Sequence, residues 1–363
     1  MEPWIGEEEK LAIIEYLDSG GWLTEFKRTQ EFEQMIAEYV GSKYAVAVNN
    51  GTVSLTVAAM ALGIGRDDEV IIPDYTMIAS ANSIVLAGAK PVFIDIDRKN
   101  LCLDLELLEE AITSKTKAVM FVSINGRYTD MKKLLSIIDR YNLFLIEDAA
   151  QSLGSKCQGK HLGTFGDVGS FSFSSPKIIT TGQGGVLVTE DDQLYSRMKM
   201  IKDFGRSASG RSEGEADFHE ILGFNFKFTD LQAVIGIEQM KKLNWRVKRK
   251  KEMYRLYREF LQNIPQIEFI DTDLQDTAPW FIDIIVKGER DRLASFLNKR
   301  GIGTRPFYPA IHTQPPYSHV KGSFPNSNWA ACSGLWLPSS SFLTDDDVQY
   351  VCKNIKEYFT GCA

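Results

Sequence analysis

The sequence of 363 residues lacks the features that mark secreted, membrane-bound and metal-dependent proteins. Its five cysteines form no Cys-x-x-Cys pair and are odd in number, which favours free thiols in a reducing compartment. Its four histidines are scattered without metal-ligand spacing. No apolar run is long enough to span a bilayer, and the opening MEPWIGEEEK has no signal-peptide layout. We therefore expect a cytoplasmic protein with no bound metal and no membrane partner.

Positive charge is also scarce. The formal net charge is −7, which argues against a nucleic-acid partner. An expected long helix from Asp230 to Met253 carries one basic cluster, which we interpret as a solvated face. The cluster consists of Arg246, Lys248, Arg249, Lys250 and Lys251. A hydrophobic content of 44% is ordinary for a globular protein, and the length suggests one large and one smaller domain.

What the sequence does contain is a lysine in an unusual setting, within residues 169–185, GSFSFSSPKIITTGQGG. Phe171 and Phe173 alternate with serines, a period of two that predicts a strand. Pro176 has no N–H to donate, so the hydrogen bonding of this strand to its neighbours stops there. A glycine turn then leads to a second strand. Lys177 therefore lies at a strand end, where its amine could form a Schiff base with an aldehyde such as pyridoxal phosphate (PLP). Because most lysines are solvated surface groups, Lys177 alone does not decide the function.

A second candidate cluster follows the apolar run 143–146, which predicts a buried strand. Glu147, Asp148 and Gln151 come directly after it, at the strand end where α/β folds bind ligands. A carboxylate such as Asp148 could keep the pyridine nitrogen of PLP protonated, and Gln151 could donate a hydrogen bond to the ring oxygen. The alternative is that Glu147 and Asp148 only cap a following helix.

A candidate phosphate site lies where the expected strand 44–48 runs into Asn49-Asn50-Gly51-Thr52 and a helix. Free N–H groups and the positive end of the helix dipole favour a phosphate at such a junction. Gly51 would let the phosphate approach, and Thr52 would add a hydroxyl. The alternative is a plain helix-capping turn.

Six segments together resemble the DegT/DnrJ/EryC1/StrS family of PLP-dependent sugar aminotransferases, from about Gly21 to the C-terminus. They are VNNGTVSL, PDYTMIASANSI, IEDAAQSLGS, SFSFSSPKIITTGQGG, GFNFKFTDLQAVIG and TRPFYPAIHTQPPY. The resemblance implies the aspartate aminotransferase-like α/β fold, PLP fold type I. Its mostly parallel central sheet lies between helices, and a smaller C-terminal α+β domain follows. We expect a large PLP-binding domain with the N-terminal segment at 1–242 and a small domain at 243–363.

The resemblance also implies PLP as the cofactor, carried covalently by Lys177. The residues assigned to the cofactor are Gly51, Thr52, Met77, Asp148, Gln151, Ser172, Lys177 and Asn225. Ser172 would join Gly51 and Thr52 at the phosphate, and Met77 would lie on the ring face, where relatives often have an aromatic residue. Residues 224–228, whose alternation predicts a strand, would reach the neighbouring subunit, where Asn225 would contact the PLP phosphate. A homodimer with shared active sites follows.

The resemblance further implies a sugar nucleotide as substrate. Lys227, Arg305, Tyr308 and His312 would bind it, Arg305 at a diphosphate and Tyr308 and His312 at sugar hydroxyls. A comparable loop occurs in family members that act on nucleotide-linked 4-keto sugars, such as the GDP-perosamine synthases; the alternative is a structural loop. We expect amino transfer from L-glutamate to a nucleotide-linked keto sugar, of the 4-keto-6-deoxy type, in amino-sugar or glycan biosynthesis such as that of lipopolysaccharide O-antigen.

Two other functions stay open. An aminocyclitol (keto-inositol) aminotransferase would share all the cofactor motifs, and a non-catalytic PLP-binding regulatory protein would keep them without turnover. A sugar dehydratase of this family usually has histidine where Lys177 stands, so Lys177 argues against that activity. Residues 123–127, Ser-Ile-Asn-Gly-Arg, stand where relatives commonly have a His-Leu-Tyr/Phe-Gly pattern.

Overall fold

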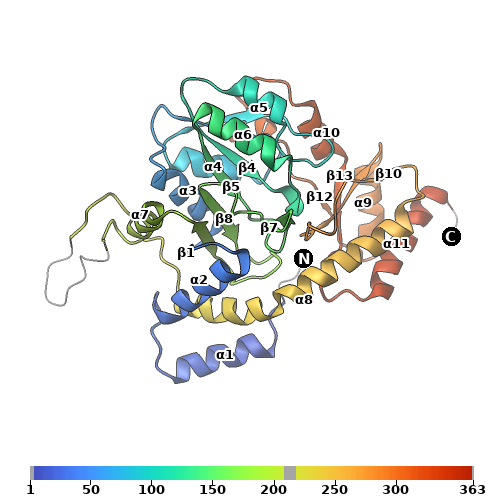
Figure 1. Ribbon diagram of the computed structural model, residues 1–363. Coiled ribbons are helices and arrows are strands. Elements are labelled where there is room, and N and C mark those ends of the chain that lie inside the picture. Colours follow the sequence, from blue (N-terminus) through green and yellow to red (C-terminus); the bar gives the residue numbers. More distant parts are fainter. Residues whose placement is uncertain (1–3, 208–217, 362–363) are drawn as a thin grey trace.

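The computed structural model describes residues 4–207 and 218–361, and its largest feature is a seven-stranded sheet (Figure 1). The strands are β1 (Tyr44–Val48), β2 (Glu69–Pro73), β3 (Lys90–Ile94), β4 (Thr116–Val122), β5 (Phe144–Asp148), β8 (Val168–Ser172) and β9 (Gly185–Thr189). Their order is β1-β9-β8-β5-β4-β2-β3, and only the pairs that involve β9 are antiparallel. A mostly parallel sheet places the carboxyl ends of most strands at one edge, where a site is expected.

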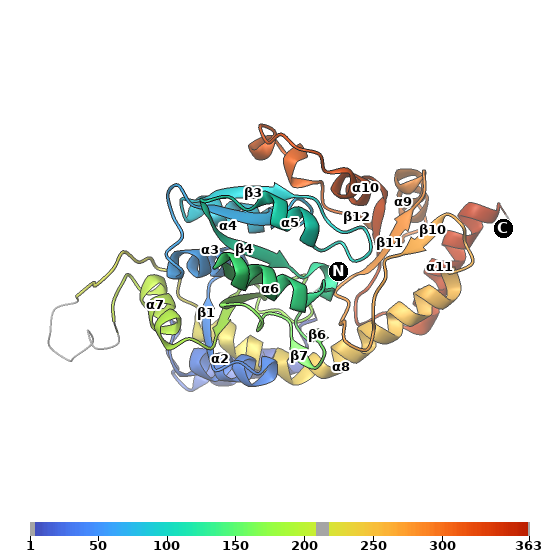
Figure 2. The same cartoon turned by 45° about the horizontal axis from the view of Figure 1, so that its top comes forward.

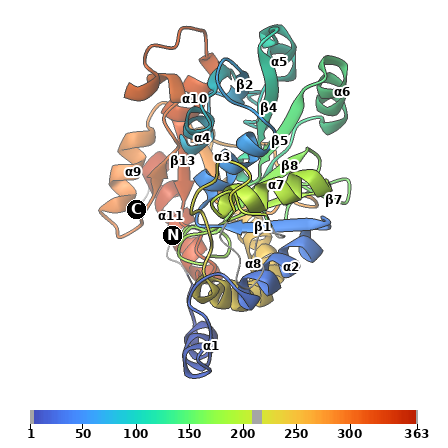
Figure 3. The same cartoon turned by 90° about the vertical axis from the view of Figure 1, so that its left-hand side faces the viewer.

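Helices cover both faces of this sheet, because its strands are apolar on both sides. The helices of this part are α1 (Glu7–Asp18), α2 (Lys27–Val40), α3 (Gly51–Ala61), α4 (Ala79–Leu86), α5 (Leu105–Ala111), α6 (Met131–Tyr141) and α7 (Asp192–Lys202), with a short 3-10 turn, η1 (Ile124–Gly126). Successive side chains of β1 point to opposite faces, so Val46 packs toward α3 and α4 and Ala47 toward α2. The helices α5 and α6 cover the other strands on the α2 side (Figures 1 and 3). A two-stranded hairpin, β6 (Lys156–Cys157) and β7 (Lys160–His161), follows β5.

The C-terminal part is built on a four-stranded antiparallel sheet in the order β10-β11-β13-β12. Its strands are β10 (Ile267–Phe269), β11 (Ile282–Val286), β12 (Arg305–Pro306) and β13 (Gly334–Leu337). Its helices are α9 (Arg290–Asn298), η3 (Ile311–Thr313), η4 (Pro315–Tyr317), α10 (Pro325–Ser333) and α11 (Asp345–Thr360). The α/β fold with a smaller α+β part is therefore confirmed.

One helix, α8 (Asp230–Leu261), joins the two parts, and Figure 2 shows it passing from beneath the large sheet to the small one. Leu243 packs in the core beneath the large sheet, whereas Met253 packs in the core of the small sheet. The predicted boundary at 242/243 lies inside this continuous helix and stays a prediction. Among the described helices, none has the combination of length and apolar character that a membrane crossing requires.

The basic cluster on α8 corrects the prediction of a solvated face, because Arg246 and Lys250 are buried. Arg246 donates to the carbonyl of Ile178 at 2.9 Å, and Lys250 donates to the carbonyl of Trp280 at 2.9 Å and to that of Ser339. The reason is that α8 lies between the core beneath the large sheet and the core of the small sheet. The helix face that would be solvated in a surface helix therefore meets backbone carbonyls from loops of both parts.

The prediction of a strand at 224–228 is also wrong in part. Its backbone is extended, but it makes only single bridges, Asn225 opposite Asp203 and Lys227 opposite Val48. An alternation of apolar and polar residues predicts a strand only if a partner strand lies beside it. Here the segment lies between the end of α7 and the end of β1, so no ladder forms.

Candidate active site

Lys177 lies in the turn that follows β8, a strand that ends at Ser172, before Pro176. Its Nζ is 3.7 Å from the ring centroid of Trp280, whose Nε1 donates to the carbonyl of Pro176 at 2.6 Å. Burial lowers the pKa of Lys177 to about 8, the charge of Asp148 opposes this shift, and that of Arg305 adds to it. About half of the amine is therefore neutral near pH 8, which suits a nucleophile and a proton carrier.

Asp148 ends β5 and is buried. Its Oδ2 accepts a hydrogen bond from Ser80 Oγ at 2.7 Å, and its Oδ1 accepts the N–H of Ala150 at 3.2 Å. Burial raises the pKa of Asp148, while these two hydrogen bonds and the charge of Lys177 lower it. Sequence reasoning missed Ser80, which lies on α4 within a quoted segment but has no local signal that names its partner.

Glu147 has a different role from its neighbour, because adjacent strand residues point to opposite faces. It accepts the N–H groups of Gly163, Phe165 and Gly166 at 2.8, 2.5 and 2.8 Å. It therefore holds the turn before β8 in place. The chain after β5 continues through turns to β6, so neither carboxylate caps a helix.

Gln151 is buried, and its Oε1 accepts the N–H of Asn125 at 2.8 Å. With its oxygen occupied in this way, the amide presents its NH₂ as a donor. Gln151, Ser172 and Lys177 line one small cavity together with Trp280. The structure thus brings three residues that the sequence assigned to the cofactor to one place.

Asn125 is a second residue that sequence reasoning missed. Its side-chain amide donates to the carbonyl of Phe281 at 3.0 Å and accepts the N–H of Phe281 at 2.7 Å. Its backbone is left-handed, with φ of 53°, a conformation that asparagine tolerates better than most residues. The signal available was its place in residues 123–127, which depart from the family pattern.

The start of α3 meets the end of β8. Asn50 caps the helix by accepting the N–H of Val53 at 2.9 Å. Within the described chain, the N–H groups of Gly51 and Thr52 have no protein acceptor, so they stay available to an anion. A Cβ on Gly51 would lie 2.9 Å from Cβ of Ser172, so only glycine allows this approach.

Met77, Asn225 and Lys227 are not among the residues that line the small Lys177 cavity. Met77 is 44% exposed at the start of α4, and its sulfur accepts the N–H of Ala79 at 3.1 Å. Asn225 is exposed, and Lys227 forms an ion pair with Asp203 at 2.8 Å. The segment that carries Asn225 and Lys227 lies beside the end of β1, where the N–H of Asn49 donates to the carbonyl of Phe226 at 3.0 Å.

β12 and the loop after it carry three of the predicted substrate residues, Arg305, Tyr308 and His312. The Arg305 guanidinium lies over the rings of Tyr308, at 5.6 Å, and Trp336, at 5.4 Å. Burial, with a contribution from the charge of Asp148, raises the pKa of Tyr308 to about 12, so its hydroxyl stays protonated and can donate.

His312 is held by Asp74 in this structure, and its role toward the substrate stays a prediction. Its N–H and its Nδ1 bond the two carboxylate oxygens of Asp74, at 2.9 and 2.6 Å, and its ring stacks on Phe324. We therefore interpret His312 as the anchor of this loop. No group of three or more His, Cys, Asp or Glu side chains in the described residues could hold a metal ion.

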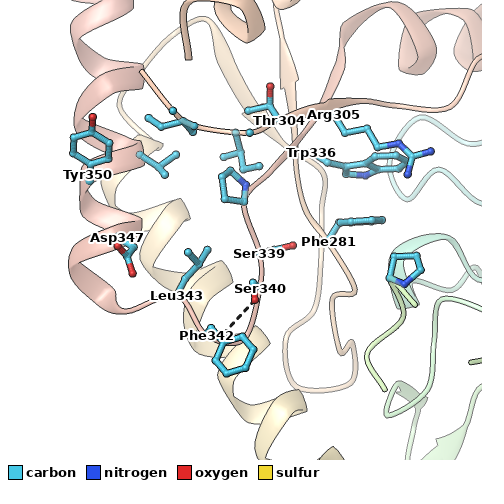
Figure 4. Close-up of a pocket in the computed structure, with 17 residues that line it drawn as sticks. Phe281, Thr304, Arg305, Trp336, Ser339, Ser340, Phe342, Leu343, Asp347 and Tyr350 are labelled. Carbon is cyan, nitrogen blue, oxygen red and sulfur yellow. Dashed lines mark hydrogen bonds between the residues drawn. The ribbon is translucent and has the colours of Figure 1, made fainter. Parts of the chain in front are cut away.

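A cleft of about 810 Å³ opens beside this site, and Figure 4 shows it. Pro176, next to Lys177, and Arg305 line its inner end, and the connection from β13 to α11 lines the other. A volume of this size suits a ligand rather than a few waters.

Comparison with known proteins gives consistent matches over nearly the whole chain. A model of the DegT/DnrJ/EryC1/StrS aminotransferase family matches residues 3–356. The GDP-perosamine synthase of Vibrio cholerae is 37% identical over 364 residues, which cover 99% of this chain and 98% of that protein. The GDP-perosamine synthase of Escherichia coli O157:H7 is 36% identical over 361 residues, with coverage of 99% and 98%.

Two solved structures show the likeness in three dimensions. The aminotransferase from Psychrobacter cryohalolentis has a TM-score of 0.94 at 28% identity, covering 99% of this chain and 98% of that one. The PLP form of a Streptococcus pneumoniae protein described as a sugar aminotransferase has a TM-score of 0.91 at 25% identity, with coverage of 98% and 96%.

The residues around Lys177 fit PLP on structural grounds. The approach of Gly51 to Ser172 leaves two backbone N–H groups and a hydroxyl for a phosphate. The carboxylate of Asp148 suits a ring nitrogen, and the NH₂ of Gln151 suits a ring oxygen. The site therefore offers an amine, a carboxylate and an amide that match the aldehyde, ring nitrogen and ring oxygen of PLP.

Proposed function

The chain belongs to the DegT/DnrJ/EryC1/StrS aminotransferase family, and we propose that it transfers the amino group of L-glutamate to a nucleotide-linked 4-keto-6-deoxy sugar. The protein is a sugar aminotransferase, and its cofactor is PLP. The two relatives named GDP-perosamine synthase support a GDP-linked sugar as the substrate. Amino-sugar and glycan biosynthesis, including that of O-antigen, is the setting we propose, in the cytoplasm, where the free cysteines would stay reduced.

The observation that carries the proposal is the half-buried Lys177, whose amine is desolvated and feels the charge of Asp148. When bound, PLP supplies an aldehyde that accepts the amino group and a ring that draws electrons from the carbon losing its proton. The chain supplies the rest: Lys177 holds the cofactor and carries protons at Nζ, and Asp148 holds a positive charge at the ring nitrogen. Glutamate leaves as the 2-oxo acid while the sugar ketone becomes an amine, so no external oxidant is needed.

Substrate positioning falls to β12 and the loop after it. We propose that Arg305 pairs with the diphosphate, since a guanidinium forms a bidentate contact with phosphate oxygens. The protonated hydroxyl of Tyr308 would donate to a sugar oxygen. An arginine whose charge reaches Lys177 suits the diphosphate of a sugar nucleotide, whereas a keto-inositol carries no phosphate for it to bind.

We also propose a homodimer with shared sites, in which Asn225 and Lys227 serve the partner's site. Neither side chain lies at the Lys177 cavity of its own chain, and Asn225 is exposed. Apolar residues near them are exposed too, with Leu222 at 76% and Phe224 at 37%. Such residues suit burial between two copies.

The test is a pair of half-reactions with purified, PLP-loaded protein. Glutamate alone should convert the cofactor to its amine form, and a GDP-linked 4-keto-6-deoxy sugar should restore the aldehyde form. We expect Lys177→Ala to lower both rates by a factor of about 10³, in the range for a lost acid–base group, and Asp148→Asn to lower them strongly too. Lys160→Ala, at an exposed lysine outside the site, is the control.

Each other function predicts a different outcome. A regulatory protein would show no glutamate half-reaction. An aminocyclitol aminotransferase would aminate a keto-inositol. It would aminate none of the keto sugars in a panel of GDP-, UDP- and dTDP-linked compounds. Either result would overturn the proposed substrate.

A further inference from the structure

We propose that Thr76 and Ser80 form a polarised chain of two hydroxyl groups that keeps Asp148 ionised and so holds the proton on the ring nitrogen of PLP. Both are positioning residues, because they act on the cofactor only through Asp148. The inference rests on the proposed function, which assigns the ring nitrogen to this carboxylate. The hydroxyl chain starts in the segment between β2 and α4 and ends at the last residue of β5.

The contacts of the hydroxyl chain are well formed and withdrawn from water. Oγ1 of Thr76 lies 2.9 Å from Oγ of Ser80, and Oγ of Ser80 lies 2.7 Å from Oδ2 of Asp148. Thr76 and Ser80 are fully buried, and Asp148 is buried too. Because neither hydroxyl reaches bulk water, each hydroxyl proton needs an acceptor within this group.

An ionised Asp148 gives the hydroxyl chain one direction. A carboxylate only accepts, so the single hydroxyl proton of Ser80 goes to Asp148, and Ser80 in turn accepts the proton of Thr76. Both hydroxyl protons then have an acceptor. Hydrogen bonds in such a row polarise one another, so Thr76 strengthens the bond that reaches the carboxylate.

A neutral Asp148 would require the opposite direction. A carboxyl proton on Oδ2 would go to Ser80, and Ser80 would then donate to Thr76. In the described chain, Oγ1 of Thr76 has no hydrogen-bond partner other than Ser80, so its own proton would lose its acceptor. A proton on Oδ1 would share that oxygen with the N–H of Ala150, which is also a donor. Since an unpaired buried donor is costly, these contacts favour the ionised carboxyl.

The hydroxyl chain opposes the effect of burial on Asp148. Burial raises the pKa of this carboxyl, and the hydrogen bond from Ser80 is the largest influence that lowers it, ahead of the N–H of Ala150 and the charge of Lys177. Tyr308 also lies within reach of this charge, but burial raises its pKa to about 12, so it stays neutral. A carboxyl that lost its charge could not stabilise a protonated ring, so buried Asp148 depends on its donors.

Four variants separate the hydroxyl chain from its surroundings. Ser80→Ala removes the contact with Asp148, and Thr76→Val removes only the second hydroxyl while it keeps the shape of the side chain. Thr76→Ser keeps that hydroxyl and serves as the rescue. Ser83→Ala is the matched control, because Ser83 is equally buried on α4 and its Oγ donates to the backbone carbonyl of Ser80, at 2.8 Å, rather than to the carboxylate.

The first experiment compares the binding of PLP and of 1-deaza-PLP, which has a C–H in place of the ring nitrogen, to cofactor-free protein. Equilibrium titration gives the ratio of the two dissociation constants. We expect Ser80→Ala to lower the preference for PLP at least tenfold and Thr76→Val at least threefold, because the weakened carboxylate holds the ring charge less well. Thr76→Ser and Ser83→Ala should change this preference less than twofold.

Two results of this comparison would count against the proposal. An unchanged preference in both Ser80→Ala and Thr76→Val would overturn it, even if both cofactors bound more weakly, since that is what a merely structural role predicts. A loss of preference in Ser80→Ala but not in Thr76→Val would overturn the part of Thr76.

The second experiment observes the ring nitrogen directly. PLP labelled with nitrogen-15 in its ring reports the ring proton through the nitrogen chemical shift, during a pH titration of the loaded protein. An ionised Asp148 stabilises the protonated ring and raises its pKa, so loss of the hydroxyl chain should lower the pH at which the proton leaves. We expect this pH to fall by about one unit in Ser80→Ala and about half a unit in Thr76→Val. A transition at the wild-type pH in both variants would overturn the proposal.

These outcomes are separate from those of the proposed function. Neither titration needs glutamate or a keto sugar, so a protein that aminates no sugar would still confirm or overturn the hydroxyl chain. Conversely, amination of a sugar nucleotide by Ser80→Ala protein with unchanged ring protonation would overturn the hydroxyl chain and leave the aminotransferase activity established.

Discussion

Burial disfavours the charged form of both Lys177 and Asp148, and their neighbours oppose this effect to different degrees. Lys177 lies against an indole face and loses solvation, which lowers its pKa to about 8 from the ordinary value of 10.5. Asp148 is buried with two hydrogen-bond donors, which partly compensate for its lost hydration. At this scale the chemistry depends on whether the surroundings of each side chain stabilise its protonated or its deprotonated state.

The pH dependence of cofactor uptake follows from the Lys177 pKa. Only the neutral amine attacks an aldehyde, so the rate at which PLP-free protein takes up PLP should rise through a midpoint near pH 8. Because Asp148 raises this pKa and Arg305 lowers it, Asp148→Asn should move the midpoint down and Arg305→Ala should move it up. Borohydride trapping followed by peptide mass analysis measures the uptake. A midpoint near 10.5 would contradict the desolvation of Lys177.

Asn125 is a positioning residue, because it acts on the cofactor site only through Gln151. Asn125→Gly keeps the left-handed backbone but removes both bonds to Phe281. A hydrogen bond donated by Gln151 stabilises a negative ring oxygen, so misplacing it should raise the pH at which bound PLP changes its absorption band. We expect the same direction of shift in Asn125→Gly and Gln151→Leu, and a kcat about tenfold lower, since small displacements near the reacting atoms are costly.

The matched control for Asn125 is Asn326→Ala. Asn326 donates to the carbonyl of Ile96 at 2.8 Å, a contact that involves neither Gln151 nor Phe281. A merely structural effect would lower the melting temperature of both variants and leave the absorption transition of both in place. That result would remove the positioning role.

At the scale of elements, two buried aspartates hold the substrate loop and α10 against the large sheet. Asp74 follows β2, and its carbonyl also accepts the N–H of Ile311 at 2.8 Å. Asp95 follows β3 and accepts the N–H groups of Asn326 and Ser327, each at 2.8 Å. Adjacent parallel strands thus end in equivalent anchors at the edge where the site lies.

A double-mutant cycle tests whether His312 serves the loop or the substrate. Asp74→Ala and His312→Ala should each raise KM for the sugar nucleotide about tenfold through loss of a buried charged hydrogen bond. The double variant should be no worse than either single one, because both break the same contact. Fully additive effects would show that His312 has its own contact with the substrate. Protease cleavage within residues 305–317 reports loosening of the loop independently of kinetics.

At the scale of the whole molecule, the two parts of the chain are joined near the site by a buried ion pair. Both terminal nitrogens of Arg127 bond the carboxylate of Asp283 on β11, at 2.7 and 2.6 Å. Asn125, two residues earlier, bonds Phe281, two residues before Asp283. These contacts tie the turn after β4 to the start of β11, and Trp280, next to Phe281, donates to the carbonyl of Pro176, which precedes Lys177.

Shared sites in a homodimer can be tested by mixing inactive chains. Lys177→Ala and Asn225→Ala homodimers should each be weak, but exchange of subunits creates one site that carries both lesions and one that carries neither. Activity should return to about a quarter of the wild-type value in a statistical mixture, since half of the dimers are mixed and each has one intact site. If native mass spectrometry shows exchange and no activity returns, Asn225 does not act across an interface.

The local segments were predictable because their constraints are contiguous in the chain. The alternation around Phe171 and the missing N–H of Pro176 each follow from backbone sterics and hydrogen bonding within a few residues. The glycine requirement at position 51 does not, because it comes from the approach of Ser172 in the fold. The fold, the cofactor and the aminotransferase class predicted from these segments are confirmed. The assignments of single residues to the substrate stay predictions.

What the sequence by itself determined, then, is where the candidates for a cofactor-binding amine, carboxylate and phosphate turn occur. Only the tertiary structure decided that Arg246 and Lys250 are buried and that His312 forms a hydrogen bond with Asp74, 238 residues away. The physical reason is that these partners are buried carboxylates and backbone carbonyls. Every residue has a carbonyl, so nothing in the sequence marks the few that a distant cation or amide will meet once both are withdrawn from water.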